Sequence, residues 1–201
     1  MIDHENTWDT RLQIKTTGRD DMNADQYRHP YEPTPYSVLE RLANCGLIRK
    51  DDVVIDYGCG KGRVDFFLSH QMGAKTIGIE YDERIYQSAI ENQQTTASQM
   101  KSEFMLARAE TYKVPLEVNR CYFFNPFSVE ILRKVLARII ESYYENPREM
   151  FLFFYYPSEE YLSYLMTVDA LEFYGEIACG DLFEGKDARE RIVIFSMPNW
   201  E

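Results

Sequence analysis

The sequence predicts an α/β fold, a three-layer sandwich around a seven-stranded, mostly parallel sheet that ends in an antiparallel hairpin. Two observations lead to this prediction. Short apolar runs alternate with amphipathic segments after the first 34 residues, as parallel strands alternate with their crossover helices. The last two runs, Leu171–Ile177 and Arg191–Met197, alternate in hydrophobicity and flank an acidic loop, which is typical of a hairpin.

The other elements follow from the same patterns. Apolar runs predict buried strands over Val53–Tyr57, Lys75–Glu80, Phe104–Ala107, Cys121–Asn125 and Met150–Tyr155. Apolar residues at helical spacing predict helices over Ser37–Cys45, Gly62–Gln71, Asp82–Met100, Val129–Tyr144 and Ser158–Met166. Asp82 and Ser158 stand where helix N-caps are expected.

The first 34 residues are polar and irregular, so we expect an N-terminal extension ahead of a single domain over residues 35–201. The extension is too poor in apolar residues to bury a core of its own, yet Trp8, Tyr27 and Tyr31 need a surface to pack on. We therefore expect it to form a lid over the cleft at the strand ends.

Composition limits the function. Acidic residues outnumber basic ones 33 to 22, giving a net charge of −11, which disfavours nucleic-acid partners. No apolar stretch reaches the ~20 residues that a membrane span needs, and the polar start does not resemble a signal peptide, so we expect a cytoplasmic protein. The 4 cysteines and 3 histidines are scattered, so no metal site is expected.

The segment VVIDYGCGKGRV, residues 53–64, is the most informative motif. Gly58, Gly60 and Gly62 let a ligand approach the backbone at a helix N-terminus. Asp56 and Glu80 stand at the ends of two predicted strands, where open parallel sheets bind ligands, and Glu80 offers two oxygens to ribose hydroxyls. The G-x-G-x-G spacing differs from the G-x-G-x-x-G of dinucleotide sites, and a carboxylate at Asp56 suits an ammonium group better than a pyrophosphate.

This pattern resembles motif I of class I S-adenosylmethionine-dependent methyltransferases, and GIEYDERIYQSAIEN at residues 78–92 resembles their acidic-loop motif. The resemblance implies their Rossmann-like fold and S-adenosylmethionine as the cofactor. It also implies cofactor contacts at the residues of the two motifs, namely Asp56, Gly58, Cys59, Gly60, Gly62, Glu80 and Tyr81. Many of these enzymes bind adenine with an Asp where this chain has Arg108, so we expect Ala109 or Glu110 to substitute.

Asn125–Phe127 reads N-P-F and resembles the (D/N)-P-P-(Y/F) signature of amino-group methyltransferases, one proline shorter. The resemblance implies that carbonyl groups at Asn125 and Pro126 accept hydrogen bonds from a substrate N–H while Phe127 packs against the substrate. Asn125 is also expected to contact the cofactor. The alternative is a proline-terminated strand whose Asn caps the next helix.

YEPTPY, residues 31–36, resembles a segment of membrane-associated protein-lysine methyltransferases and, more distantly, of seven-stranded histone-lysine methyltransferases. This resemblance implies that Tyr31 and Thr34 lie over the methionine end of the cofactor. The alternative is a proline-stiffened linker into the first helix of the domain.

Taken together, these resemblances imply a methyltransferase that transfers a methyl group from S-adenosylmethionine to a nitrogen of a protein side chain or a small molecule. A small-molecule O-methyltransferase, a non-catalytic S-adenosylmethionine-binding module and a Rossmann dehydrogenase are the alternatives, since a fold alone does not decide between them.

Overall fold

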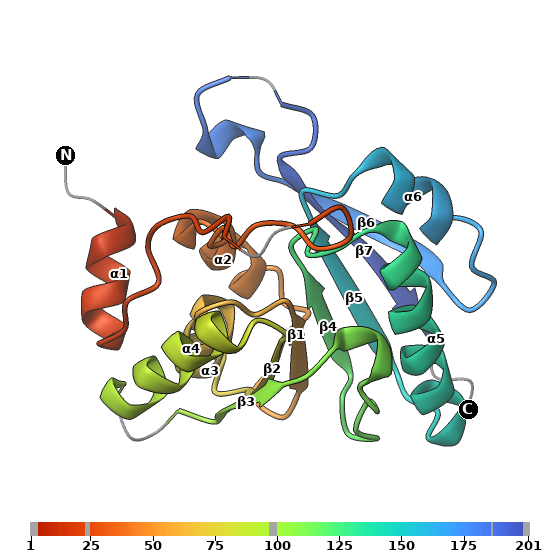
Figure 1. The fold of residues 1–201 in the computed structure, drawn as a ribbon. Coiled ribbons are helices and arrows are strands. Elements are labelled where there is room, and N and C mark those ends of the chain that lie inside the picture. Colours follow the sequence, from red (N-terminus) through yellow and green to blue (C-terminus); the bar gives the residue numbers. More distant parts are fainter. Residues whose placement is uncertain (1–3, 23–24, 97–99, 186, 199–201) are drawn as a thin grey trace.

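The computed structural model describes residues 4–22, 25–96, 100–185 and 187–198. Its sheet has seven strands in the order β3-β2-β1-β4-β5-β7-β6, and only β7 runs antiparallel to its neighbours (Figure 1). The strands are β1 (Val53–Tyr57), β2 (Lys75–Glu80), β3 (Ser102–Leu106), β4 (Arg120–Phe123), β5 (Met150–Tyr155), β6 (Glu172–Ala178) and β7 (Arg191–Met197). The predicted fold class is confirmed.

Helices cover both faces of the sheet. They are α1 (His4–Leu12), α2 (Tyr36–Ala43), α3 (Arg63–Met72), α4 (Glu83–Thr95), α5 (Val129–Glu145) and α6 (Glu159–Leu165), with short 3-10 turns η1 (Ala109–Thr111) and η2 (Gly180–Leu182). Neighbouring residues of β1 point to opposite faces, as the strand period requires. Val54 joins the core that α1 to α4 cover, and Ile55 joins the core under α5 and α6.

Most predicted boundaries agree with the structure. β1, β2, β5 and β7 have the predicted limits. Asp82 accepts hydrogen bonds from the amides of Arg84 and Ile85, and Ser158 from that of Tyr161, so both predicted N-caps are confirmed. Helix α4 ends at Thr95, earlier than predicted.

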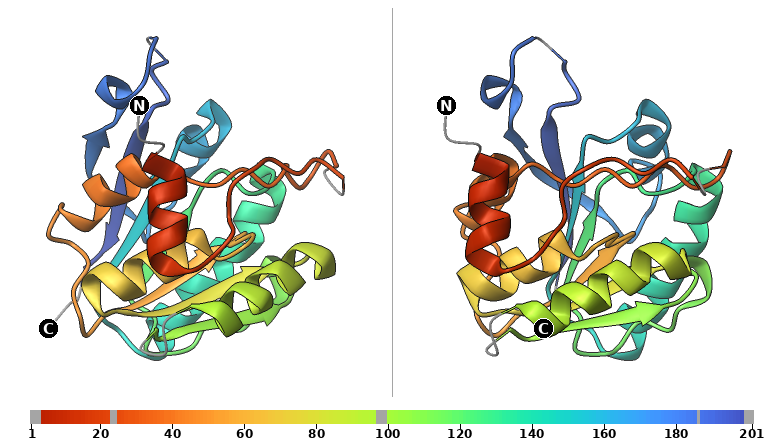
Figure 2. Two further views of the ribbon diagram at one scale, coloured as in Figure 1. Left: turned by 90° about the vertical axis from the view of Figure 1, so that its left-hand side faces the viewer. Right: turned by 60° about the vertical axis from the view of Figure 1, so that its left-hand side comes forward.

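The N-terminal extension contains a helix, α1, that the sequence pattern did not predict. Its Trp8 ring lies 4.9 Å from that of Phe67 on α3 and 5.7 Å from that of Tyr36 on α2. Trp8 therefore packs against the helical layer and not across the strand ends. After α1, the chain crosses over the carboxyl ends of the central strands toward α5 (Figure 2). Within the described ranges, no helix is both long and apolar enough to cross a membrane.

Candidate functional site

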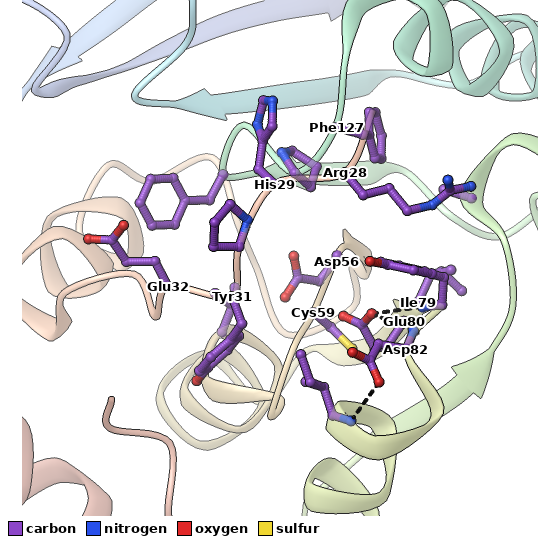
Figure 3. A pocket seen from close by; sticks show the side chains of 18 of the residues that line it. Arg28, His29, Tyr31, Glu32, Asp56, Cys59, Ile79, Glu80, Asp82 and Phe127 are labelled. Atoms are coloured by element: carbon purple, nitrogen blue, oxygen red, sulfur yellow. Dashed lines mark hydrogen bonds between the residues drawn. The ribbon is translucent and has the colours of Figure 1, made fainter. Parts of the chain in front are cut away.

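A cavity lies at the carboxyl ends of β1, β2 and β4, where the predicted site residues converge. Asp56, Cys59 and Glu80 lie on one side of it, and Arg28 and His29 of the N-terminal segment lie on the other (Figure 3). Its volume is about 80 Å³, whereas ligand pockets typically measure roughly 300–1,000 Å³. The site is therefore present but largely closed.

The glycine turn, residues 58–62, is held against the end of β2 by backbone hydrogen bonds. The amides of Gly58 and Cys59 both donate to the carbonyl oxygen of Ile79, at 2.9 and 3.1 Å. Gly58 and Cys59 line the cavity as predicted. A Cβ atom on Gly58 would lie 2.6 Å from Cβ of Pro126, so the bare backbone lets the turn approach the N-P-F motif.

The other two glycines of the motif serve packing in this structure. Gly60 has φ of +57°, and a Cβ there would lie 2.2 Å from the ring of Tyr31. Gly62 has φ of +84° and is the N-cap residue before α3, and a Cβ there would lie 2.6 Å from the ring of Phe104. Neither Gly60 nor Gly62 lines the cavity in this closed form, so the structure does not place them beside its ligand space.

Glu80 is buried, and its carboxylate is held by three backbone amides. Oε2 accepts from the amide of Gly60 at 3.1 Å, and Oε1 accepts from those of Tyr81 and Asp82 at 2.8 and 2.9 Å. Burial raises the pKa of Glu80, and these amides oppose that rise. A carboxylate offers about four lone-pair sites. Glu80 therefore has room for one further donor, whereas the sequence predicted that both of its oxygens would be offered to ribose hydroxyls.

Asp56 faces the cavity from the end of β1, with 3% of its surface exposed. Burial raises its pKa to about 7; a hydrogen bond with Asp65 lowers the pKa, and the charge of Glu80 raises it. A cation beside this carboxylate would stabilise its ionised form, because the attraction between the charges would offset the free-energy cost of burying it.

Tyr81, Ala109 and Glu110 lie together at one end of the cavity. The guanidinium of Arg28 lies 4.7 Å from the centroid of the Tyr81 ring, and its Nη2 donates to Oε1 of Glu110 at 2.9 Å. The predicted adenine surface is therefore assembled but covered by Arg28. Arg108, by contrast, does not line the cavity.

The N-P-F motif contacts the N-terminal segment directly. Nδ1 of His29 donates to the carbonyl oxygen of Asn125 at 2.6 Å, and the amide of His29 donates to that of Pro126 at 3.1 Å. The predicted acceptor carbonyls are thus occupied by the protein's own nitrogen donors. Strand β4 ends at Phe123, two residues before the predicted limit, because Asn125 adopts a left-handed conformation with φ of +41°.

Asn125 stands apart from the cofactor-side residues. Pro126 and Phe127 line the main cavity, whereas Asn125 lines a second hollow beside Tyr155 and Tyr156. Its Oδ1 atom is buried and has no hydrogen-bond partner among the described residues. A buried acceptor without a donor is costly, which marks Oδ1 as a position where a ligand donor would be stabilised.

We define the strap as residues 25–32, the stretch that crosses the cavity. Arg28 pairs with Phe127 through an isolated antiparallel bridge, and the amide of Ser128 donates to the carbonyl oxygen of Tyr27 at 2.8 Å. The hydroxyl of Tyr31 donates to the carbonyl oxygen of Thr16 at 2.6 Å. Beyond the strap, Thr34 is buried, lines the cavity and shares a hydrogen bond with the hydroxyl of Tyr122 at 3.0 Å.

Arg63 anchors this N-terminal segment to the first turn of α3. Its Nε donates to Oγ1 of Thr16 at 2.7 Å, and its Nη1 donates to the carbonyl oxygen of Thr34 at 3.2 Å and to the carboxylate of Glu5. Its guanidinium lies 4.3 Å from the centroid of the Tyr36 ring. The sequence analysis missed Arg63, although an arginine directly after a glycine turn and inside an apolar helix start was a usable signal.

Two further residues at the site, Arg28 and His29, were also missed. They lie in a polar stretch without periodicity, and their partners Glu110 and Asn125 are 82 and 96 residues away in the chain. Nothing local in the sequence indicates such pairs.

No protein-family model matches the chain. A stretch of 64 residues is 33% identical to a protein-lysine N-methyltransferase of Saccharolobus islandicus, covering 31% of this chain and 40% of that protein. A stretch of 55 residues is 42% identical to the H3 lysine-79 specific histone-lysine N-methyltransferase of Dictyostelium discoideum, covering 27% of this chain and 3% of that one. The chain thus matches less than half the length of either relative.

Solved structures resemble most of the chain. The human methyltransferase 10 domain containing protein has a TM-score of 0.62 at 12% identity, with 98% of this chain and 95% of that chain covered. An RNA methyltransferase from Salinibacter ruber, solved with S-adenosyl-L-homocysteine, has a TM-score of 0.61 at 16% identity, with 85% and 96% covered. The predicted Rossmann-like methyltransferase fold is confirmed, and the comparisons agree with the predicted class of S-adenosylmethionine-dependent methyltransferases.

The geometry of Glu80 yields a stability prediction. Glu80→Gln should lower the free energy of unfolding by about 1–3 kcal/mol, because an amide NH₂ would face a buried backbone N–H that now has an acceptor. Urea denaturation would measure the change, with Glu83→Gln on the exposed side of α4 as the matched control. Equal midpoints for the two variants would contradict this role of the carboxylate.

Proposed function

We propose that this protein is a methyltransferase that uses S-adenosylmethionine, with the cavity at the carboxyl ends of β1, β2 and β4 as its cofactor site. The observation that carries the proposal is the pair of buried carboxylates, Asp56 and Glu80, at neighbouring strand ends on either side of the glycine turn. This arrangement offers one anionic group for an ammonium and a second for a ribose hydroxyl.

The residues present fit such a cofactor. Asp56 would hold the ammonium of its methionine end, with Tyr31 and Thr34 beside it. Glu80 would take a ribose hydroxyl, and Tyr81, Ala109 and Glu110 would bound the adenine. The backbone of Gly58 and Cys59 lies between these two ends and leaves no side chain in the way of the ligand, apart from the small Cys59 thiol. When bound, the cofactor supplies a methyl group on a sulfonium, so the protein's part is mainly to position the acceptor and exclude water.

We further propose that the acceptor atom is a nitrogen. Three oxygens gather at the N-P-F motif, namely the carbonyl oxygens of Asn125 and Pro126 and Oδ1 of Asn125. Two of them already accept hydrogen bonds from nitrogen atoms of His29. An amine that replaced His29 would meet the same acceptors, with its lone pair left for the methyl group, while Phe127 would pack beside it. A protein side chain or a small molecule could supply this nitrogen, and the names of the two curated relatives favour a lysine side chain.

Two alternatives have observations in their favour. The solved structures that share the fold include an RNA methyltransferase and an O-methyltransferase, so the fold does not select the acceptor. The net charge of −11 argues against RNA, which leaves a small-molecule O-methyltransferase. A non-catalytic S-adenosylmethionine-binding module is the other alternative, because His29 occupies the acceptor oxygens.

All four cysteines are free, which supports the expected cytoplasmic location.

The central test is thermal stability with ligand. S-adenosylmethionine or S-adenosylhomocysteine should raise the melting temperature by several degrees, because a ligand present at about 100 times its Kd stabilises the native state by about 2.7 kcal/mol. NAD should give no shift and serves as the control for a dinucleotide site. The absence of a shift with either adenosyl ligand, from folded protein at saturating concentration, would falsify the proposal.

Asn125 should separate binding from chemistry. Asn125→Gly keeps the left-handed backbone but removes Oδ1, so the affinity for S-adenosylhomocysteine should stay within about two-fold while methyl transfer falls about ten-fold or more. Transfer of labelled methyl groups to acceptors in a cell extract provides the rate, and Asn146→Gly at the far end of α5 provides the control. Equal losses in affinity and rate would assign Asn125 to the cofactor or to the strand end.

We also propose that the strap is the lid expected from the sequence. The cavity of about 80 Å³ is too small for a nucleoside cofactor while Arg28 covers Tyr81, so cofactor entry requires the strap to move. Helix α1 would then be the fixed base of the extension, because Arg63 and Trp8 hold it to the helical layer.

Trypsin cleavage after Arg28 would report on this movement. The free protein should be cut there through transient opening, and S-adenosylhomocysteine should slow the cut by closing the strap over the ligand. Cleavage after Lys50, in an exposed turn before β1, should be unaffected and serves as the internal control. If the rate at Arg28 is the same with and without ligand, and the clipped protein binds equally well, the segment is a tail and not a lid.

A further inference from the structure

Asp65 is a buried carboxyl group that the proposed function leaves unexplained. It lies in the first turn of α3 with 1% of its surface exposed, behind the cavity. Neither of its side-chain oxygens has a hydrogen-bond donor among the described residues. Its close polar side chains include Asp56 and Thr76, and the carboxyl groups of Asp56 and Asp65 are within hydrogen-bonding reach of one another.

Two carboxylates in this position cannot both stay ionised. Asp56 is 3% exposed, and no arginine, lysine or histidine in the described part of the chain is paired with either acid. Burial raises the pKa of Asp65 well above the usual carboxyl range, and the neighbouring charge of Asp56 raises it further. The proton that joins the pair therefore resides on Asp65 at neutral pH, and Asp56 accepts its hydrogen bond.

The other groups around the pair do not replace the proton that the two carboxyl groups share. These groups are Glu80, Cys59, Tyr31, Tyr122, Thr76, Ser102 and Arg63. Glu80 is a second anion, and burial raises the pKa of the Cys59 thiol so that it stays neutral. The hydroxyls of Thr76 and Ser102 donate to the backbone carbonyl oxygen of Asp65. A hydrogen bond with Thr76 also lowers the pKa of the Asp65 carboxyl group, but burial and the charge of Asp56 raise it by more.

Arg63, a buried cation in the same turn of α3 as Asp65, makes its hydrogen bonds elsewhere. Arg63 directs its hydrogen bonds to Glu5, Thr16 and Thr34. Its Nη2 has no hydrogen-bond partner among the described residues and lies 3.8 Å from Oδ1 of Asp9. The pair thus carries one negative charge, on the acid that faces the cavity, and has no cation of its own.

We propose that Asp65 is a positioning residue whose neutral carboxyl group donates a hydrogen bond to Asp56 and so holds the Asp56 carboxylate ready for the ammonium of the cofactor's amino-acid end. The inference rests on the proposed function and adds a residue to its site. A neutral donor fixes the orientation of Asp56 without adding a second negative charge, so the pair matches a single ammonium.

Binding of two ligands to three variants tests this role. S-adenosylhomocysteine carries the ammonium, and 5′-methylthioadenosine lacks the amino-acid end. Calorimetry is best done at about pH 7.5, above the pKa of Asp56 and no higher than that of an ordinary α-amino group.

Asp65→Asn keeps a neutral donor, so its affinity for S-adenosylhomocysteine should stay within about three-fold of the native value. Asp65→Val and Asp56→Asn should lose about ten-fold. All three should bind 5′-methylthioadenosine as the native protein does.

The pH dependence of unfolding tests the proton itself. The folded protein holds a proton on Asp65 that the unfolded chain releases near pH 4, so this group contributes stability at low pH that is lost as the pH rises toward its folded pKa. Asp65→Asn should therefore flatten the decline in unfolding free energy between about pH 5 and pH 8. Asp51→Asn, an exposed acid in the turn before β1, should keep the native slope.

Three results would overturn the proposal. Native-like binding of S-adenosylhomocysteine by Asp65→Val would mean that Asp65 does not contribute to ligand affinity. A loss in Asp65→Asn as large as in Asp65→Val would mean that its charge is needed. An unchanged pH slope in Asp65→Asn would mean that Asp65 carries no proton. If the native protein bound neither ligand, both the proposed function and this role of Asp65 would be wrong. The pH dependence of unfolding would still show whether Asp65 holds a proton in the folded protein.

Discussion

The buried guanidinium of Arg63 is the interaction on which the arrangement of the site depends. It is 2% exposed and joins the start of α3 to three separate points of the N-terminal segment, at Glu5, Thr16 and Thr34. A buried cation that loses its partners is destabilising by about 3–5 kcal/mol. The hydrogen bonds that Arg63 makes therefore fix α1 and the approach to the strap, and so determine what can lie over the strand ends.

From that anchor the strap reaches both halves of the site. Tyr31 fills the space that Gly60 leaves by lacking a side chain, and His29 meets the carbonyl oxygens of Asn125 and Pro126. The glycine turn thus accommodates a ring from the protein itself. Its backbone freedom has two uses, one in packing the N-terminal segment and one, as proposed, in admitting the cofactor.

The sheet was predictable from the sequence because its signals are local. Buried parallel strands appear as continuous apolar runs, and the limits of β1, β2, β5 and β7 follow from them. The acids at the ends of β1 and β2 were predictable for the same reason, since a motif of fixed spacing places Asp56 and Glu80. Helix α1 was not predicted, because only Trp8 and Leu12 among its nine residues are large apolar side chains that become buried, and tertiary contacts stabilise it.

The closed form of the site could not be predicted from the sequence. The motifs indicated which residues converge, yet the closure by Arg28 depends on a contact with Glu110, 82 residues away in the chain. Asp65 shows the same limit, because an acid in the first turn of a helix is ordinary in a sequence. Only its buried position behind Asp56, with no hydrogen bond assigned to its side-chain oxygens among the described residues, distinguishes it.

Adjacent residues of the strap, Arg28 and His29, cover opposite ends of the site, one at Tyr81 and the other at Asn125. A strap that moves as one unit uncovers both ends in the same event. Cofactor exchange and acceptor exchange would then share a single opening step, and the kinetic scheme would contain no state in which one ligand leaves while the other stays sealed. Processivity, the transfer of several methyl groups to one bound acceptor, would be disfavoured by this architecture, because renewing the cofactor exposes the acceptor to release.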